Sequence, residues 1–150
     1  MRRFLVVLAA GATLALAWVP QAQAASGPPS SLHIQGRATL KAGIQVALRL
    51  KITCGPYTDF EPGENQVSLE QAVGSQIASG SGALTLVCDG TQHLIKSYVW
   101  AAPSGPPFQA GPAAVQVSIA PCGEAGGSFS CSPASERKVV QLVAGGGSSS

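Results

Sequence analysis

Hydrophobic residues alternate with polar ones along most of the chain, and a helical period is nearly absent. From residue 44 to residue 54 every second residue is apolar, and the positions between them are mostly polar, as in "LRLKITC". A period of two is typical of a strand with one buried and one solvated face, as antiparallel sheets contain. The pattern therefore predicts a β-protein.

The alternation predicts seven strands, and residues that favour turns separate them. We expect Gly74 to mark a bulge within one long strand, and Gly80–Gly82 to form a tight turn. The apolar set, including Ile44 and Ile77, should face the core, with Trp100 and Phe108 as core and loop anchors. Both faces of residues 92–101 carry large groups, so their orientation stays open. The expected strands are residues 32–40, 44–54, 66–79, 83–88, 92–101, 115–119 and 136–143.

Seven short strands of this kind predict an all-β fold, an antiparallel immunoglobulin-like β-sandwich with two disulfides. The sandwich should occupy residues 32–143. An extended leader precedes it at residues 25–31, and a flexible Gly/Ser tail follows at residues 144–150.

The first 24 residues have the pattern of a secretory signal peptide: Arg2 and Arg3, an apolar run, and then "AQA". The apolar run from Phe4 to Val19 has 16 residues, short of the roughly 18–20 that span a bilayer. Whether export follows the general or the twin-arginine route stays open. We expect a secreted, extracellular protein that has no membrane contact after cleavage.

The net charge of the chain falls when the residues of the predicted signal peptide are left out. The chain has nine basic and seven acidic residues, and removal of Arg2 and Arg3 leaves seven of each. A net charge of zero predicts no basic field for nucleic acid or for an anionic membrane.

Four cysteines in a small exported domain predict two disulfides, for which three pairings exist. Cys54 and Cys88 both lie in register with core-facing leucines, whereas Cys122 is out of register with the apolar residues of its strand. We therefore expect the pairs Cys54–Cys88 and Cys122–Cys131. A zinc site is the alternative, but the chain has no C-x-x-C pair.

The first pair constrains the topology. Cys54 and Cys88 each end a strand, so these strands should point the same way, with an even number of chain reversals between them. The loops at 55–65, 89–91 and 122–135 then share one end, and those at 41–43, 80–82 and 102–111 share the other. Both disulfides should brace the first end.

Side chains for catalysis are sparse in this sequence. His33 and His93 lie among polar neighbours, which favours a solvated face, and no serine has glycines at positions −2 and +2. Asp59, Glu61 and Glu64 could supply oxygen ligands to calcium, but they lack the alternation of a dedicated loop. We expect no enzymatic activity, no cofactor and no metal.

If the domain binds a partner, the disulfide-braced end is the expected contact surface. Tyr57, Phe60 and Phe129 lie in its loops, and four acidic residues accompany them: Asp59, Glu61, Asp89 and Glu124. Aromatic anchors ringed by charge are typical of binding patches. The alternative is that the aromatic residues cover the lower edge of the core.

The segments "IASGSGALTLVC" and "PPFQAGPAA", together with the cysteine spacings, resemble an uncharacterised family of small secreted immunoglobulin-like domains of actinomycete bacteria. The resemblance implies a bacterial exported sandwich and no catalytic residue. The segment "GSFSCSP" is faintly similar to the reactive loop of bacterial subtilisin inhibitors. We therefore predict a secreted, non-catalytic binding or structural module of the cell surface or medium. Its partner is an unknown protein or cell-wall component, and a secreted protease inhibitor with a braced loop is the alternative.

Overall fold

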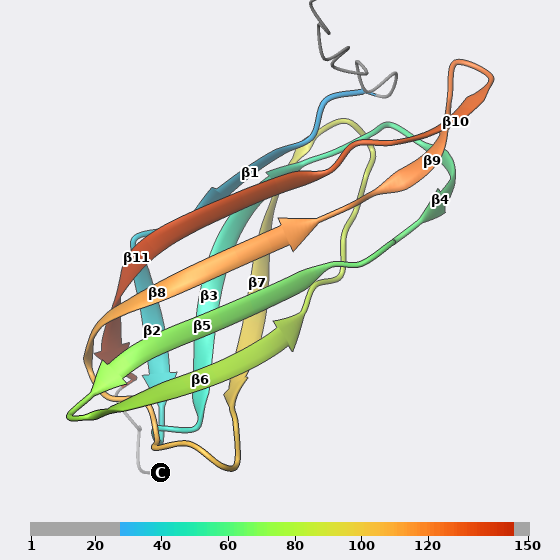
Figure 1. Cartoon of the computed structure of the whole chain (residues 1–150). Helices are drawn as coiled ribbons and strands as arrows, with labels where there is room; N and C mark the ends of the chain where they lie inside the picture. The colour runs from blue at the N-terminus through green and yellow to red at the C-terminus, as the bar shows by residue number, and fades with distance from the viewer. Residues whose placement is uncertain (1–27, 146–150) are drawn as a thin grey trace, which may run out of the picture.

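A computed structural model describes residues 28–145, and these residues form eleven β-strands and no helix (Figure 1). The predicted all-β class is confirmed. The predicted signal peptide at residues 1–24, the start of the predicted leader and most of the predicted tail lie outside the described residues. The strands are β1 (Ser31–Ile34), β2 (Arg37–Lys41), β3 (Gln45–Thr53), β4 (Thr58–Glu61), β5 (Gln66–Val73), β6 (Gln76–Ala83), β7 (Gln92–Ala101), β8 (Gly111–Ile119), β9 (Cys122–Ala125), β10 (Ser128–Cys131) and β11 (Ala134–Ala144).

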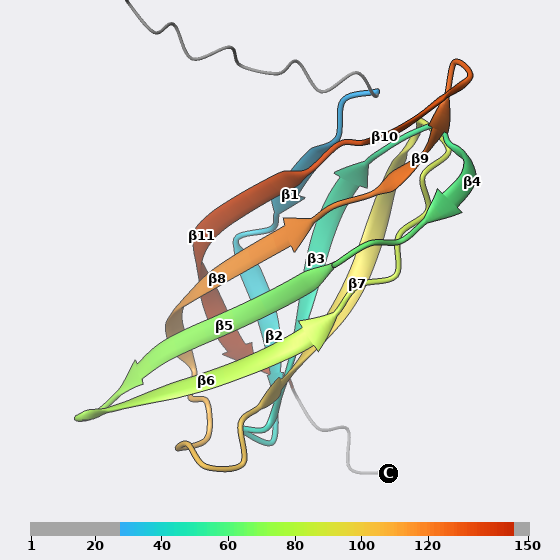
Figure 2. The same cartoon turned by 45° about the vertical axis from the view of Figure 1, so that its right-hand side comes forward.

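Seven of these strands form a closed ring in the order β2-β3-β7-β6-β5-β8-β11, with β11 parallel to β2. In Figures 1 and 2, β5, β6, β8 and β11 cross in front of β2, β3 and β7. The strands β3 and β7 pair along their length, whereas β6 and β7 share only two residue pairs. The hydrogen bonding thus joins the strands into one barrel-like sheet, and two separate sheets of a sandwich are not confirmed. A second small sheet has the order β10-β9-β4.

The predicted strand at residues 32–40 is two strands, β1 and β2, with a break at Gln35 and Gly36. Both pair with β3, where Ile34 lies opposite Leu50 and Thr39 lies opposite Ala47. The chain therefore advances five residues from β1 to β2 while β3 advances three, which leaves two extra residues at the break. The bend allows β2 to reach β11.

Two side chains of β11 replace the missing backbone pairing beside β1. The carboxylate of Glu136 accepts a hydrogen bond of 2.7 Å from the Ile34 amide, and the Lys138 ammonium donates one of 2.7 Å to the Ile34 carbonyl. The backbone groups of Ile34 are therefore satisfied although β1 has no backbone pairing with β11 on this side.

The predicted single strand at residues 66–79 is wrong. The chain reverses after Val73, where Gly74 has a positive φ of 60°, and β5 pairs with β6 as a hairpin. Gly74 thus makes the turn rather than a bulge.

The predicted turn at 80–82 is also wrong, because these residues lie within β6. A Cβ on Gly80 would lie 2.4 Å from the carbonyl oxygen of Trp100, and one on Gly82 would lie 2.1 Å from that of Tyr98. The glycines are required because β6 crosses close to the backbone of β7.

The predicted strand at 83–88 is wrong beyond Ala83, which ends β6. Residues 84–88 have no assigned strand pairing but still alternate, with Leu84, Leu86 and Cys88 buried. The pattern therefore gave the correct buried side chains without the predicted strand.

The core is built from the inward residues of the ring, including Leu48, Leu50, Val99 and Val117. Phe108 is buried as expected, but Trp100 is 56% exposed because the even-numbered residues of β7 face outward. Ile44 and Ile77 are also exposed, which corrects their assignment to the core. They lie near chain reversals at the end of the molecule opposite the disulfides, and Ile77 belongs to the hairpin that projects past the other strands (Figure 1).

Candidate functional site

The two disulfides join the predicted cysteines, Cys54 to Cys88 and Cys122 to Cys131. Cys54 follows β3 and Cys88 ends the extended segment after β6, so both chains run toward the same end (Figure 1). The even number of reversals is therefore correct, although the second reversal is at Gly74.

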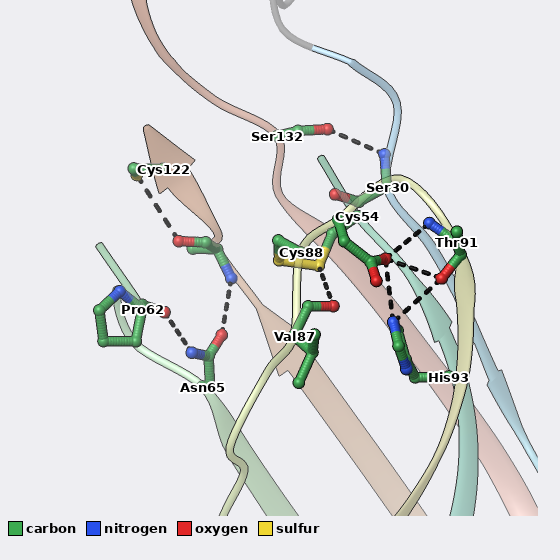
Figure 3. The surroundings of a disulfide bond; sticks show 12 residues. Ser30, Cys54, Pro62, Asn65, Val87, Cys88, Thr91, His93, Cys122 and Ser132 are labelled. Atoms are coloured by element: carbon green, nitrogen blue, oxygen red, sulfur yellow. Dashed lines mark hydrogen bonds and ion pairs between the residues drawn. A yellow bond between two sulfur atoms is a disulfide. The ribbon is translucent and has the colours of Figure 1, made fainter. Parts of the chain in front are cut away.

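The buried Cys54–Cys88 disulfide lies between two backbone hydrogen bonds, with its surroundings shown in Figure 3. The Gly90 amide donates to the Cys54 carbonyl at 2.9 Å, and the Tyr57 amide donates to the Cys88 carbonyl at 3.3 Å. Gly55 has a φ of 81°, and a Cβ there would lie 2.4 Å from the carbonyl oxygen of Cys88. The disulfide and these bonds join the loops at 55–65 and 89–91.

The small sheet adds the third loop. The strands β9 and β10 form a hairpin that the Cys122–Cys131 disulfide closes, and β4 pairs with β9 on the other side. Three segments that lie far apart in the sequence thus meet at one end of the ring, as predicted (Figure 1). We call residues 55–65, 89–91 and 122–131 the braced end.

Asn65 ties the first of these segments to the chain that enters β9. Its side-chain oxygen accepts a hydrogen bond of 3.2 Å from the Ala120 amide, and its amide group donates to the Pro62 carbonyl (Figure 3). Gly63 has a positive φ of 56°, and a Cβ there would meet the Ala120 carbonyl oxygen at 2.2 Å. Close packing and hydrogen bonds therefore hold the loop in addition to the disulfides.

The three predicted aromatic contacts differ in exposure. Tyr57 and Phe60 are half-buried against the core, with ring centroids 6.5 Å apart, and Tyr57 packs on Gly123. The hydroxyl groups of Tyr57 and Ser130 are buried without a hydrogen-bond partner. Phe129 on β10 is 57% exposed. Tyr57 and Phe60 thus form the base of the braced end, and Phe129 is its exposed aromatic; their role in contact stays a prediction.

Most acidic residues of the protein lie in the same three segments as these aromatic residues. Five of the seven acidic side chains of the protein lie at the braced end and are exposed: Asp59, Glu61, Glu64, Asp89 and Glu124. Within residues 28–145, no three His, Cys, Asp or Glu side chains gather in a group that could hold a metal ion. The braced end therefore carries most of the acidic side chains together with an exposed phenylalanine, and Glu124 lies opposite Phe129 in the β9–β10 hairpin.

Asp89, Thr91 and His93 form a hydrogen-bonded cluster beside the first disulfide (Figure 3). One oxygen of Asp89 accepts hydrogen bonds of 2.8 Å from the amide and the hydroxyl of Thr91 and lies 2.9 Å from Nε2 of His93. The hydrogen bond from His93, followed by those from Thr91, holds the pKa of the Asp89 carboxyl well below its usual range. The ionised carboxylate therefore favours the folded state above about pH 4, and this contribution is lost as the pH falls further.

The cluster does not have the geometry of a catalytic triad. In a triad the histidine uses one ring nitrogen for the carboxylate and the other for the nucleophile. Here the same atom, Nε2 of His93, lies 2.9 Å from Asp89 and 3.1 Å from the Thr91 hydroxyl. The cluster instead fixes the turn at residues 89–91. His33 is exposed, with Nδ1 at 3.8 Å from Glu136.

The two disulfides should differ in their accessibility to reductants. Cys54 is fully buried and Cys88 nearly so, whereas Cys131 is exposed on the hairpin. Since thiol exchange requires access to a sulfur atom, we expect mild reduction followed by alkylation to label Cys122 and Cys131 first. Mass spectrometry of the labelled peptides measures the order. Full unfolding in denaturant is the control, and there the preference should disappear; earlier labelling of Cys54 in the folded protein would contradict the structure.

No family model matches the sequence, and no curated protein does. Among solved structures, a structure of murine CRIg is similar to 79% of this chain over the whole of its own chain, with 9% identity and a TM-score of 0.38. This similarity is too low to carry an argument. The resemblance to the actinomycete family stays a prediction. Among the described residues, no helix has the length and hydropathy needed to cross a membrane.

Proposed function

We propose that the protein is an exported, non-catalytic binding module that recognises a basic partner through the braced end. The observation that carries the proposal is the exposed Phe129 within a surface that holds five acidic side chains. The segments that bear them are held by disulfides, strand pairing and hydrogen bonds. A surface ordered before binding loses less conformational entropy when a partner docks.

An extracellular location is consistent with two disulfides in a small domain, since such bonds persist in oxidising compartments. Together with the signal-peptide pattern of residues 1–24, they support secretion from the cell. The partner would then be an exported or surface protein with a basic patch around an apolar pocket.

The finer form of the fold that we propose is immunoglobulin-like. The pairings β1-β3-β7 and β5-β8-β11 correspond to the A-B-E and C-F-G strand groups of that fold. After β1 has paired with β3, the chain continues into β2, which pairs with both β3 and β11 and so joins the two groups. Recognition by loops at one end is common on such scaffolds.

The alternative function, protease inhibition, would need a loop that enters a protease cleft in extended form. Residues 128–131 instead pair with residues 122–125 in the β9–β10 hairpin. This pairing holds the segment as one strand of a closed hairpin rather than as a separate loop, although the outer edge of β10 is unpaired among the described residues. The hairpin therefore favours a binding surface over an inhibitory loop.

Capture of exported and surface proteins on immobilised residues 25–150 tests the proposal. We expect a captured protein that is lost with Phe129→Ala and weakened by Glu124→Gln, while Val139→Ala changes nothing. Val139 is a matched control because it is an apolar side chain, 66% exposed, on β11. Retention of the same proteins by Phe129→Ala, or tight inhibition of subtilisin or chymotrypsin by the wild type, would overturn the proposal.

A further inference from the structure

Positive charge gathers on one outer face of the ring, although the sequence beyond residue 24 has no net charge. The sequence beyond residue 24 has seven basic residues, and five of them are exposed on this face, on the adjacent strands β2, β3 and β7. We call this surface the basic face; its members are Arg37, Lys41, Arg49, Lys51 and Lys96. The acidic residues lie mainly at the braced end, so the two charges are separated on the molecule.

Strand register brings these side chains together. Arg49 lies opposite Lys96, and the outward residues of β2 flank β3 on its other side. Two like charges directly opposite each other destabilise a sheet. Within residues 28–145 none of the five basic side chains forms an ion pair. The positive charge of this face is therefore not compensated by the chain around it.

A shallow groove of about 250 Å³ runs across the basic face. Arginines and lysines from three strands line the groove together with uncharged side chains, and no acidic residue lines it. The lining residues are Arg37, Thr39, Lys41, Gln45, Ala47, Arg49, Lys96 and Tyr98. The Lys96 ammonium lies 5.2 Å from the centre of the Tyr98 ring. The groove therefore presents unpaired cationic side chains together with polar groups that can bind hydroxyls.

Trp100 continues this surface toward the end of β7. It is 56% exposed, lies opposite Gln45, and borders a second hollow with Ile44 and Lys41. An exposed indole beside a cationic groove provides an apolar platform on which a sugar ring can lie. Arg37 and Arg49 can each pair with a carboxylate through two parallel hydrogen bonds.

We propose that the basic face binds an acidic polysaccharide whose sugar carboxylates pair with Arg37, Arg49 and Lys96 and whose ring stacks on Trp100. The site is distinct from the braced end. Single-stranded nucleic acid is less well matched, because it uses several successive stacking platforms, and here Lys96 covers Tyr98 and leaves Trp100 as the platform. An anionic bilayer is flat and would contact only the rim of the groove.

Calorimetric titration of residues 25–150 with oligogalacturonate tests the proposal. We expect binding that weakens as salt rises. The double variant Arg49→Gln/Lys96→Gln should bind about tenfold more weakly or worse, and Trp100→Ala about threefold. Arg137→Gln is the matched control, because Arg137 is exposed on another part of the sheet beside Ser68 and Glu70, and its affinity should equal that of the wild type.

Phe129→Ala should also bind oligogalacturonate like the wild type, so this test and the capture test fail independently. Thermal melts of each variant establish that it is folded. Equal affinity of the double variant and the wild type would overturn the proposal, as would no binding of oligogalacturonate. Tighter binding of single-stranded DNA or of phosphatidylglycerol vesicles would assign the face to another class of ligand.

Discussion

Replacement of both Cys54 and Cys88 by alanine should lower the free energy of unfolding by about 4 kcal/mol, the loss expected when a cross-link over 34 residues is removed. The disulfide lies at the edge of the core, with Cys54 fully buried, so the loss of packing adds to the entropic effect. A small domain has a total stability of about 5–15 kcal/mol, so this loss would remove about a quarter or more of the total.

Urea denaturation of the wild type and the variant measures this difference. The matched variant removes Cys122 and Cys131, which close only nine residues, and it should lose less, about 2.5–3 kcal/mol. An equal or smaller loss for the Cys54–Cys88 variant would contradict the role of this disulfide as the main support of the braced end.

The second large effect should come from Gly82→Ala in β6. The added Cβ would lie 2.1 Å from the carbonyl oxygen of Tyr98, so β6 and β7 would have to separate. Overpacking against backbone costs about 3 kcal/mol, and here it would also disturb the short pairing that joins β6 to β7 and closes the ring.

Gly36→Ala provides the control for this substitution. A Cβ on Gly36 has no neighbour within 4 Å, and its φ lies outside the left-handed region. The change should be neutral or raise stability by about 0.5 kcal/mol through the unfolded state. Thermal unfolding of both variants measures the effects, and a Gly82→Ala protein as stable as Gly36→Ala would show that β6 does not pack on β7 as described.

The local alternation of apolar and polar residues predicted those strands in which successive alternate side chains face the core. The strand β7 coincides with its predicted segment, β3 is one residue shorter at each end, and β8 and β11 extend theirs. The register of Cys54 and Cys88 with the core predicted their pairing. These features depend on the two-residue period alone, and this period is independent of which strands are neighbours.

The errors arise where long-range contacts decide the structure. Gly80-Ser81-Gly82 has the composition of a turn, but its glycines allow the backbone of β7 to approach closely. Likewise, β4 lies in a loop without alternation and forms only because β9 lies beside it. Neither contact is visible in the local sequence.

The basic face could not be predicted for the same reason. Lys96 lies far along the chain from Arg49, and only the pairing of β3 with β7 places them opposite each other. Net charge was uninformative because the acidic residues that balance these cations lie at the braced end. The exposure of Trp100 also depends on which face of β7 meets the core.

The central claim is that the braced end is already ordered in the free protein, and hydrogen exchange of its backbone amides tests this most directly. The amides of Tyr57 and Gly90 in the braced end, and of Ser132 directly after it, donate to the carbonyls of Cys88, Cys54 and Pro121 at 3.3, 2.9 and 3.0 Å. We predict slow exchange of all three in the wild type, and faster exchange of Tyr57 and Gly90 after loss of the Cys54–Cys88 disulfide. Exchange of these amides in the free protein at the rate of an unstructured peptide would contradict the claim.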